Sequence, residues 1–197
     1  MMVETPHGPA RVHLRETEDA GAALVLGHGA GGGVTAPDLV AATEAALEEG
    51  MSVALVEQPY RVAGRRSPAP AHQLDAAWTA VVEHLAFRLP LVVGGRSLGA
   101  RVACRTADQT GAIAVLCLAF PLHPPGRPEA SRLAELDAVT VPVLVVQGER
   151  DPFGMPPEGP RRTVVRVQGD HGLKSDLAAV AEAIREWLQR VASSLRS

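Results

Sequence analysis

Short apolar runs that alternate with amphipathic stretches restrict the fold of this chain more than any other feature. Each run is rich in Val, Leu or Ala and lacks regular polar alternation, as expected for strands covered on both faces. The five runs are AALVLG (22–27), MSVALVE (51–57), LVVGG (91–95), AIAVLCLAF (112–120) and VPVLVVQG (141–148). The more polar TVVRVQG (163–169) is predicted near a sheet edge, and ARVHLRE (10–16) alternates like an antiparallel strand open to water on one side.

Helical patterns lie between these runs. They cover 37–50, 72–88, 97–109, 130–139 and 173–195. The first begins with Pro37 and ends with Gly50, residues that favour the start and the end of a helix. Strands that alternate with helices predict a mostly parallel sheet with helices on both faces, which is a three-layer α/β fold. The chain has 197 residues and no internal repeat, so we expect one α/β domain over 1–197.

A serine lies where one predicted strand passes directly into a helix. Gly95-Arg96-Ser97-Leu98-Gly99 fits the pattern G-x-S-x-G, and the strand–turn–helix context is the one in which this pattern forms a nucleophile elbow. So tight a turn strains the backbone of Ser97, and the flanking glycines avoid collisions with the neighbouring strand and helix. The N-terminus of the following helix also favours negative charge beside the serine. The motif therefore predicts Ser97 as a nucleophile.

An activated serine also needs a base and an acid that orients the base. In this kind of fold they follow the serine in the order Asp or Glu, then His, at the ends of later strands. Asp151 follows the run that ends at residue 148, and His171 follows the run that ends at residue 169. We therefore predict that Ser97, Asp151 and His171 are the nucleophile, the acid and the base.

Each of these residue types also has an ordinary structural interpretation. An Asp-Pro pair commonly begins a turn, and a histidine in a loop is usually solvated. Asp170, next to the histidine, is the alternative acid, and Glu149 and Asp176 are weaker alternatives. The joint occurrence of serine, aspartate and histidine in this order and at strand ends favours the catalytic interpretation.

A glycine-rich loop, GHGAGGG, spans residues 27–33 after the first buried run. A hydrolase with a serine nucleophile needs two backbone N–H donors for the oxyanion, one of them from such an early loop. We expect the N–H of Ala30, with Gly31 as the alternative, to act together with the N–H of Leu98. His28 is expected to be structural.

The same loop offers a competing interpretation. Gly27, Gly29 and Gly32 spell G-x-G-x-x-G after a strand, and Glu57 ends the next predicted strand, as in a dinucleotide-binding fingerprint. The third glycine of that motif packs a helix onto the strand, whereas here Pro37 marks a helix start several residues later. This interpretation also leaves the serine, aspartate and histidine without a role.

Charge and hydropathy exclude several classes of function. The net charge is −3 and the basic residues are scattered, so no nucleic-acid partner is expected. Residues 1–16 hold no apolar signal core, and no stretch approaches the ~20 apolar residues of a membrane span, so we expect a soluble cytoplasmic protein without a membrane partner. Cys104 and Cys117 are expected as reduced core residues, and the histidine and cysteine spacings predict neither a metal nor a cofactor.

Four stretches of the sequence carry a resemblance to a known family. GHGAGG, GGRSLGARVA, FPLHPPGRPE and VPVLVVQGERDPFG resemble the α/β-hydrolase family, and the resemblance covers the chain from about residue 22 onward. More narrowly, they are similar to a small dienelactone-hydrolase-like subgroup that includes testis-expressed and chromatin-complex relatives. Dienelactone hydrolases carry cysteine where this chain has Ser97, so their substrate cannot be carried over.

The resemblance implies the α/β-hydrolase fold and a serine hydrolase acting on a small acyl substrate. An ester, thioester or related bond would acylate Ser97, and water activated through His171 would release the acyl group. Between the runs ending at residue 120 and starting at residue 141 there is room only for a minimal cap, which predicts an open, shallow site. A binding module of the same fold with a weak or vestigial site is the alternative from another functional class.

Loop positions suggest residues that contact the substrate. Tyr60, His123 and Phe153 follow predicted strands and Phe120 ends one, and all four are expected to line the pocket. Arginines at 61, 65, 66 and 96 offer one or two guanidinium groups that could clamp a substrate carboxylate, and Arg61 and Arg96 are the main candidates. Exposed arginines in loops are more often only solvated.

Overall fold

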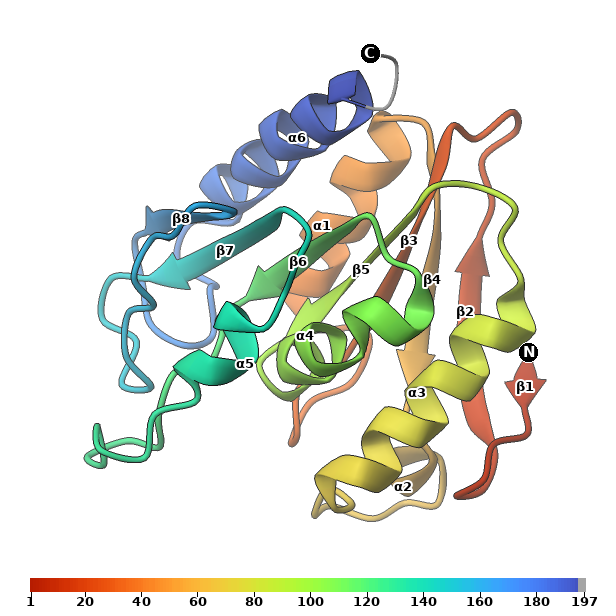
Figure 1. Ribbon diagram of the computed structural model, residues 1–197, viewed down its shortest axis with the longest axis horizontal. Helices are drawn as coiled ribbons and strands as arrows, with labels where there is room; N and C mark the ends of the chain where they lie inside the picture. Colours follow the sequence, from red (N-terminus) through yellow and green to blue (C-terminus); the bar gives the residue numbers. More distant parts are fainter. Residues whose placement is uncertain (195–197) are drawn as a thin grey trace.

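Within residues 1–194, the part of the chain that the computed structural model describes, eight strands form one twisted sheet (Figure 1). The strands are β1 (Met2–Val3), β2 (Ala10–Arg15), β3 (Ala22–Gly27), β4 (Met51–Glu57), β5 (Leu91–Arg96), β6 (Ala114–Leu118), β7 (Val143–Gly148) and β8 (Arg162–Val167). Their order is β1-β2-β4-β3-β5-β6-β7-β8. β1 and β2 pair antiparallel to each other and β2 pairs antiparallel to β4, whereas β4, β3 and β5 to β8 run parallel.

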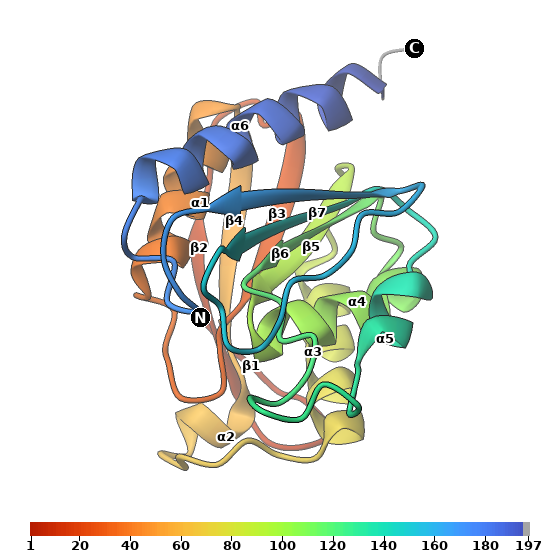
Figure 2. The same cartoon turned by 90° about the vertical axis from the view of Figure 1, so that its left-hand side faces the viewer.

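Helices cover both faces of this sheet. They are α1 (Pro37–Glu48), α2 (Pro59–Val62), α3 (Ala71–Leu85), α4 (Leu98–Thr110), α5 (Leu133–Asp137) and α6 (Leu177–Ser194). α1 and α6 lie on one face, and α3, α4 and α5 lie on the other (Figures 1 and 2). Side chains alternate accordingly along β3, since Val25 packs on the side of α3 and α4 while Leu24 and Leu26 pack on the side of α1 and α6. The predicted three-layer α/β fold is confirmed.

The apolar runs predicted the strands of the sheet centre closely, and the differences lie at ends and edges. β6 is shorter than the predicted strand 112–120, because Ala119 has a left-handed φ of 48° that ends the extended backbone. β8 is an edge strand, as its more polar sequence predicts. The sequence analysis missed β1 and α2, which are too short to show a hydrophobic period.

The last helix begins later than the sequence pattern suggests. α6 starts at Leu177, whereas the predicted helix spans 173–195, because the Asp176 carboxylate accepts a hydrogen bond from the N–H of Ala179 at 3.0 Å. An acceptor at this place caps the first turn of a helix. The final residue of the predicted helix, Leu195, lies outside the described residues.

The carboxyl edge of the sheet carries little additional structure. Between β6 and β7 the five-residue α5 is the only helix, so no inserted cap covers this edge within residues 1–194. Cys104 on α4 and Cys117 on β6 are free and buried, with their Sγ atoms 3.5 Å apart. Among the helices of residues 1–194, none combines the length and the apolar character that crossing a membrane requires.

Glycines allow an unusually close crossing of β3, β5 and α4. A Cβ atom at Gly95 would lie 2.5 Å from the Gly27 carbonyl oxygen and 2.8 Å from the Gly99 carbonyl carbon, and a Cβ atom at Gly99 would overlap the same Gly27 carbonyl. Side chains at either position would therefore push α4 away from the sheet. The expected reason for glycine on both sides of Ser97 is confirmed by this packing.

Replacing Gly99 by Ala is expected to destabilise the fold, because the added methyl group meets sheet backbone that cannot move aside. Overpacking of this kind costs about 1–3 kcal/mol, and we expect the upper part of that range. Gly32→Ala is the matched control, since a Cβ atom at Gly32 would have no described atom within 4 Å apart from its chain neighbours. Urea unfolding measures both variants, and an equal loss of stability in the two would contradict the close crossing.

Candidate active site

Ser97 occupies the turn between β5 and α4 in a strained conformation. Its φ is 51° and its ψ is −106°, in a region that residues other than glycine seldom adopt. The N–H of Ser97 donates a hydrogen bond to the carbonyl of Leu118 at 2.9 Å, which ties the turn to the end of β6. The tie and the glycine packing hold the hydroxyl at the carboxyl edge of the sheet, where ligands of parallel sheets bind.

Ser97, His171 and Asp151 form one hydrogen-bonded chain. His171 Nε2 lies 2.9 Å from Ser97 Oγ, and His171 Nδ1 lies 2.8 Å from Asp151 Oδ2. Because a carboxylate only accepts, the ring proton belongs on Nδ1, and Nε2 is left to accept the hydroxyl proton of the serine. The Asp151 side chain has no exposed surface, and that of His171 is 17% exposed. The fold thus brings together the three residues that the sequence analysis singled out, from the ends of β5, β7 and β8.

Further donors hold the Asp151 carboxylate. Oδ1 accepts from the N–H of Phe153 at 2.8 Å, and Oδ2 accepts from Nε2 of Gln147 at 2.8 Å. The ring of Phe153 also stacks on the imidazole of His171, with the ring centroids 4.2 Å apart. The sequence analysis missed Gln147, and the one signal for it was a polar side chain inside the apolar run of β7.

The alternative acids have other contacts. Asp170 is exposed, and its Oδ1 accepts from the N–H of Gly172 at 2.8 Å, so it shapes the turn around the histidine. Asp176 caps α6, and Glu149 is exposed. Among residues 1–194, Asp151 is the carboxylate that His171 contacts.

Arg96, a candidate substrate contact in the sequence analysis, makes two contacts within the protein. Its Nε lies 2.9 Å from Oδ2 of Asp38, whose side chain is fully buried, and its Nη2 donates to the carbonyl of His171 at 2.9 Å. Burial raises the pKa of Asp38, and the positive charge of Arg96 opposes that rise. Arg96 therefore links the start of α1 to the main chain of the histidine loop.

The glycine-rich loop after β3 is held by two neighbouring side chains. His28 is buried, and its Nε2 accepts from the N–H of Gln58 at 3.1 Å, so the ring proton sits on Nδ1, which donates to the Gly29 carbonyl at 2.8 Å. Burial lowers the pKa of His28 and keeps the ring neutral. The Tyr60 hydroxyl donates to the Ala30 carbonyl at 2.9 Å. His28 thus has the structural contacts that the sequence analysis expects.

The loop also passes close to the elbow. A Cβ atom at Gly29 would lie 2.8 Å from Arg96 Nη1 and 3.7 Å from the Cβ of Ser97, so a larger residue would separate the two segments. The N–H groups of Ala30 and Leu98 make no hydrogen bond to any of the described residues. Both remain available to an oxygen bound at this edge.

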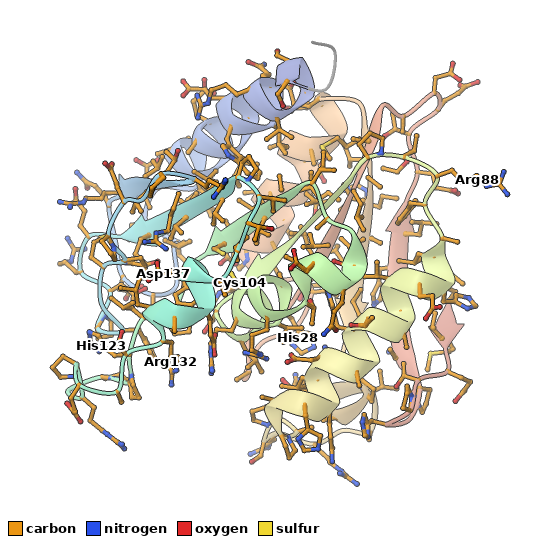
Figure 3. All side chains as sticks on the ribbon, in the orientation of Figure 1. His28, Arg88, Cys104, His123, Arg132 and Asp137 are labelled. Carbon is orange, nitrogen blue, oxygen red and sulfur yellow. The ribbon has the colours of Figure 1, made fainter. Side chains whose placement is uncertain are left out.

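The remaining expected pocket residues differ in their surroundings. Phe120 has no exposed surface and packs in the core on the side of α3 and α4, because the chain after β6 turns inward there. Tyr60 is buried too, and burial raises its pKa to about 12. His123 lies in the loop after β6, apart from His28 (Figure 3). Its ring packs against Gly154. These contacts contradict the expectation that the Phe120 ring lines an open pocket.

The glycines of residues 27–33 lack the packing of a dinucleotide fingerprint. α1 begins at Pro37, and a Cβ atom at Gly32 would meet none of the described atoms within 4 Å apart from its chain neighbours. Gly32 therefore does not mediate a close contact between helix and strand. Within residues 1–194, no group of three His, Cys, Asp or Glu side chains is placed to hold a metal ion.

Comparison with known proteins places the chain in a family. A family model described as "Alpha/beta hydrolase domain" matches residues 20–195, and the chain belongs to this family. A search of curated protein sequences found no match.

Several solved structures share the fold. Est1E from Butyrivibrio proteoclasticus, solved with ferulic acid, is 17% identical, with a TM-score of 0.82 over 98% of this chain and 99% of its own. The lidless serine hydrolase XC6422 from Xanthomonas campestris is 21% identical, with a TM-score of 0.77 over 96% and 93%. Dienelactone hydrolase from Anabaena variabilis is 17% identical, with a TM-score of 0.76 over 96% and 95%. At these identities the likeness shows the α/β-hydrolase fold.

Replacing His28 by Gln tests whether the neutral imidazole makes stability depend on pH. The pKa of His28 is lowered from 6.5 by burial, so the unfolded chain binds a proton at a higher pH than the native chain does. The free energy of unfolding therefore decreases as the pH falls below 6.5, the pKa of histidine in the unfolded chain, by at most about 1.4 kcal/mol per pH unit. Glutamine does not titrate, so we expect a smaller loss of stability in the variant between about pH 7.5 and pH 5.5.

Urea unfolding at the two pH values measures this difference. The raised pKa of Asp38 acts in the opposite direction, but it is present in both proteins and cancels in the comparison. The same pH dependence in the unmodified chain and in His28→Gln would show that His28 is not held neutral.

Proposed function

We propose that this protein is a serine hydrolase that cleaves an ester, thioester or related acyl bond of a small substrate. The observation that carries the proposal is the hydrogen-bonded chain from the strained Ser97 through His171 to the buried Asp151. The motifs GHGAGG and GGRSLGARVA support membership in the small dienelactone-hydrolase-like subgroup that includes testis-expressed and chromatin-complex relatives.

In the proposed reaction, Ser97 Oγ attacks the acyl carbon while His171 Nε2 takes the hydroxyl proton. Asp151 holds the ring in the correct tautomer and stabilises the imidazolium that forms. The N–H groups of Ala30 and Leu98 would bind the oxyanion, and removing one such donor typically costs about 3 kcal/mol of transition-state stabilisation. His171 then gives its proton to the leaving group, whose bond to the acyl carbon breaks, and the collapse of the tetrahedral intermediate leaves Ser97 acylated. A water molecule, deprotonated by His171, attacks the acyl carbon, and His171 returns the proton to Ser97 Oγ as the bond to the acyl group breaks.

The absence of a cap among residues 1–194 supports a small substrate. With only α5 between β6 and β7, the described residues hold no inserted helical cap that could enclose a long acyl chain. We therefore propose short or protruding acyl groups as the preferred substrates. The chemistry uses side chains and backbone N–H groups alone, and it needs no cofactor.

Ser97→Ala is expected to abolish hydrolysis of a short p-nitrophenyl ester and labelling by a fluorophosphonate probe, because both reactions use the activated hydroxyl. Loss of a nucleophile of this type lowers kcat by about 10⁶-fold. Asp151→Asn is expected to lower kcat by about 10⁴-fold, because the histidine loses its correct tautomer. Glu149→Gln is the control for the acid, and it should retain full activity because its side chain is exposed.

Two results would contradict the proposed function. Labelling that persists in Ser97→Ala would place the nucleophile elsewhere. A folded, unmodified chain that reacts with neither reagent would favour a binding module of the same fold.

Arg61 supports a preference for substrates that carry a carboxylate. It is half-buried and lies close enough to His28 and Tyr60, which hold the glycine-rich loop, to lower the pKa of both. Arg61 forms no ion pair with any residue of the described chain. A guanidinium that is partly withdrawn from water and lacks a carboxylate partner would gain from an anionic ligand, since hydrogen bonds between charged groups are strong.

Arg61→Gln is expected to raise KM for a p-nitrophenyl hemisuccinate by about tenfold or more, through the loss of a charged hydrogen bond. KM for the neutral p-nitrophenyl butyrate should stay unchanged. Arg66→Gln, which removes an exposed arginine of the same loop, is the matched control and should affect neither ester. Equal effects of Arg61→Gln on both esters would contradict the carboxylate preference.

A further inference from the structure

Gln147 is a polar side chain inside an otherwise apolar strand. It lies on β7, where Val143 to Val146 are buried, and its own side chain has no exposed surface. An amide withdrawn from water is costly unless it is hydrogen-bonded. Its contacts therefore indicate why a polar residue is placed here.

The amide nitrogen of Gln147 faces three acceptors. Nε2 lies 2.8 Å from Asp151 Oδ2, 2.8 Å from the Gly154 carbonyl oxygen and 3.0 Å from the Phe120 carbonyl oxygen. None of these oxygens carries a proton when the carboxylate is ionised, so only a donor fits between them. The amide nitrogen carries two hydrogens, so the three acceptors share them.

The opposite end of the same amide is not used. Oε1 of Gln147 is buried and has no hydrogen-bond partner among the described residues. A glutamine that only stabilised the core would be expected to satisfy both ends, because an unpaired buried acceptor is costly. Only the Nε2 end of the Gln147 amide is hydrogen-bonded, and this end faces the Asp151 carboxylate.

The donor acts on the oxygen that also faces the histidine. Asp151 Oδ2 receives Gln147 Nε2 on one side and His171 Nδ1 on the other, while Oδ1 receives the Phe153 N–H. With all three donors in place the carboxylate cannot rotate about its Cβ–Cγ bond without breaking hydrogen bonds. Gln147 also joins this carboxylate to Phe120, two residues after the Leu118 carbonyl that anchors Ser97.

We infer that Gln147 is a positioning residue for the reaction, because its amide locks the Asp151 carboxylate in the orientation that holds His171 toward Ser97. It acts through Asp151 and does not touch the substrate. The inference rests on the proposed serine hydrolase function, and it adds a fourth side chain on which the rate of the chemical step depends.

The test is Gln147→Met, which keeps the length of the side chain and removes the donor. Loss of a hydrogen bond to a charged group predicts that kcat falls by about 10- to 100-fold while KM changes little. Thr106→Val is the matched control, because it removes a buried hydroxyl that donates only to the Val102 carbonyl within α4. It should leave kcat unchanged, and rates are compared per folded molecule from the unfolding curves of each variant.

A measurement that does not need turnover separates this inference from the proposed function. The proton on His171 Nδ1 gives a downfield NMR signal when the carboxylate shields it from exchange, and Asp151→Asn identifies that signal by its loss. We expect the signal to disappear by fast exchange in Gln147→Met and to persist in Thr106→Val. If Gln147→Met does not fold, Gln147→Leu also lacks a donor and should lose the signal in the same way.

The outcomes are distinct. A persistent signal in Gln147→Met, with kcat lowered no more than in Thr106→Val, would overturn the positioning role. An unmodified chain that shows the signal and its loss in Gln147→Met, but no labelling of Ser97, would overturn the proposed function and leave the role of Gln147 in orienting Asp151 intact.

Discussion

The carbonyl of Gly27 occupies the space that side chains at Gly95 and Gly99 would need, and the whole carboxyl edge of the sheet depends on this contact. Because nothing larger than glycine stands there, α4 can begin directly against β3. The chain then reverses at Ser97 with a φ of 51°, a strain that is offset by packing and by the hydrogen bond to Leu118. The close crossing also brings the N-terminus of α4 beside the glycine-rich loop.

His171 is held through both its main chain and its ring. Arg96, paired with the buried Asp38, binds the carbonyl of the histidine, while Asp151 binds its imidazole. Both carboxylates are withdrawn from water, and removing Arg96 as the partner of the buried Asp38 charge would typically cost about 3–5 kcal/mol. The loop that carries His171 contains no helix or strand, so these polar contacts, and not regular secondary structure, place the imidazole over Ser97.

Several polar side chains at the carboxyl edge of the sheet bind other groups of the protein. Arg96 adjoins the serine in the sequence, which suggests a substrate contact, yet its guanidinium pairs with Asp38 and donates to the carbonyl of His171. Gln147 likewise donates its hydrogen bonds to Asp151 and to backbone carbonyls. Arg61 is the contrasting case, since no residue of 1–194 pairs with its charge.

Much of the architecture follows from the sequence alone, because strand and helix formation here depends on local patterns of apolar residues. The buried runs predict β3, β4, β5 and β7 nearly to their ends, and the motif around Ser97 predicts the turn because glycine is required at both flanking positions. The order of serine, aspartate and histidine at strand ends also follows, since parallel strands deliver their carboxyl ends to one edge.

Tertiary structure alone decided the partners of the polar groups. Asp38 and Arg96, or Gln147 and Phe120, meet only after separate strands and helices have packed, and no local pattern encodes which donor will face which acceptor. The inward turn that buries Phe120 was also decided by tertiary structure, because it depends on the space that α3 and α4 leave beside the sheet. The sequence by itself determined the elements and the reactive residues, whereas folding decided which side chains hold them in place, since burial and hydrogen-bond geometry arise only between segments distant in the chain.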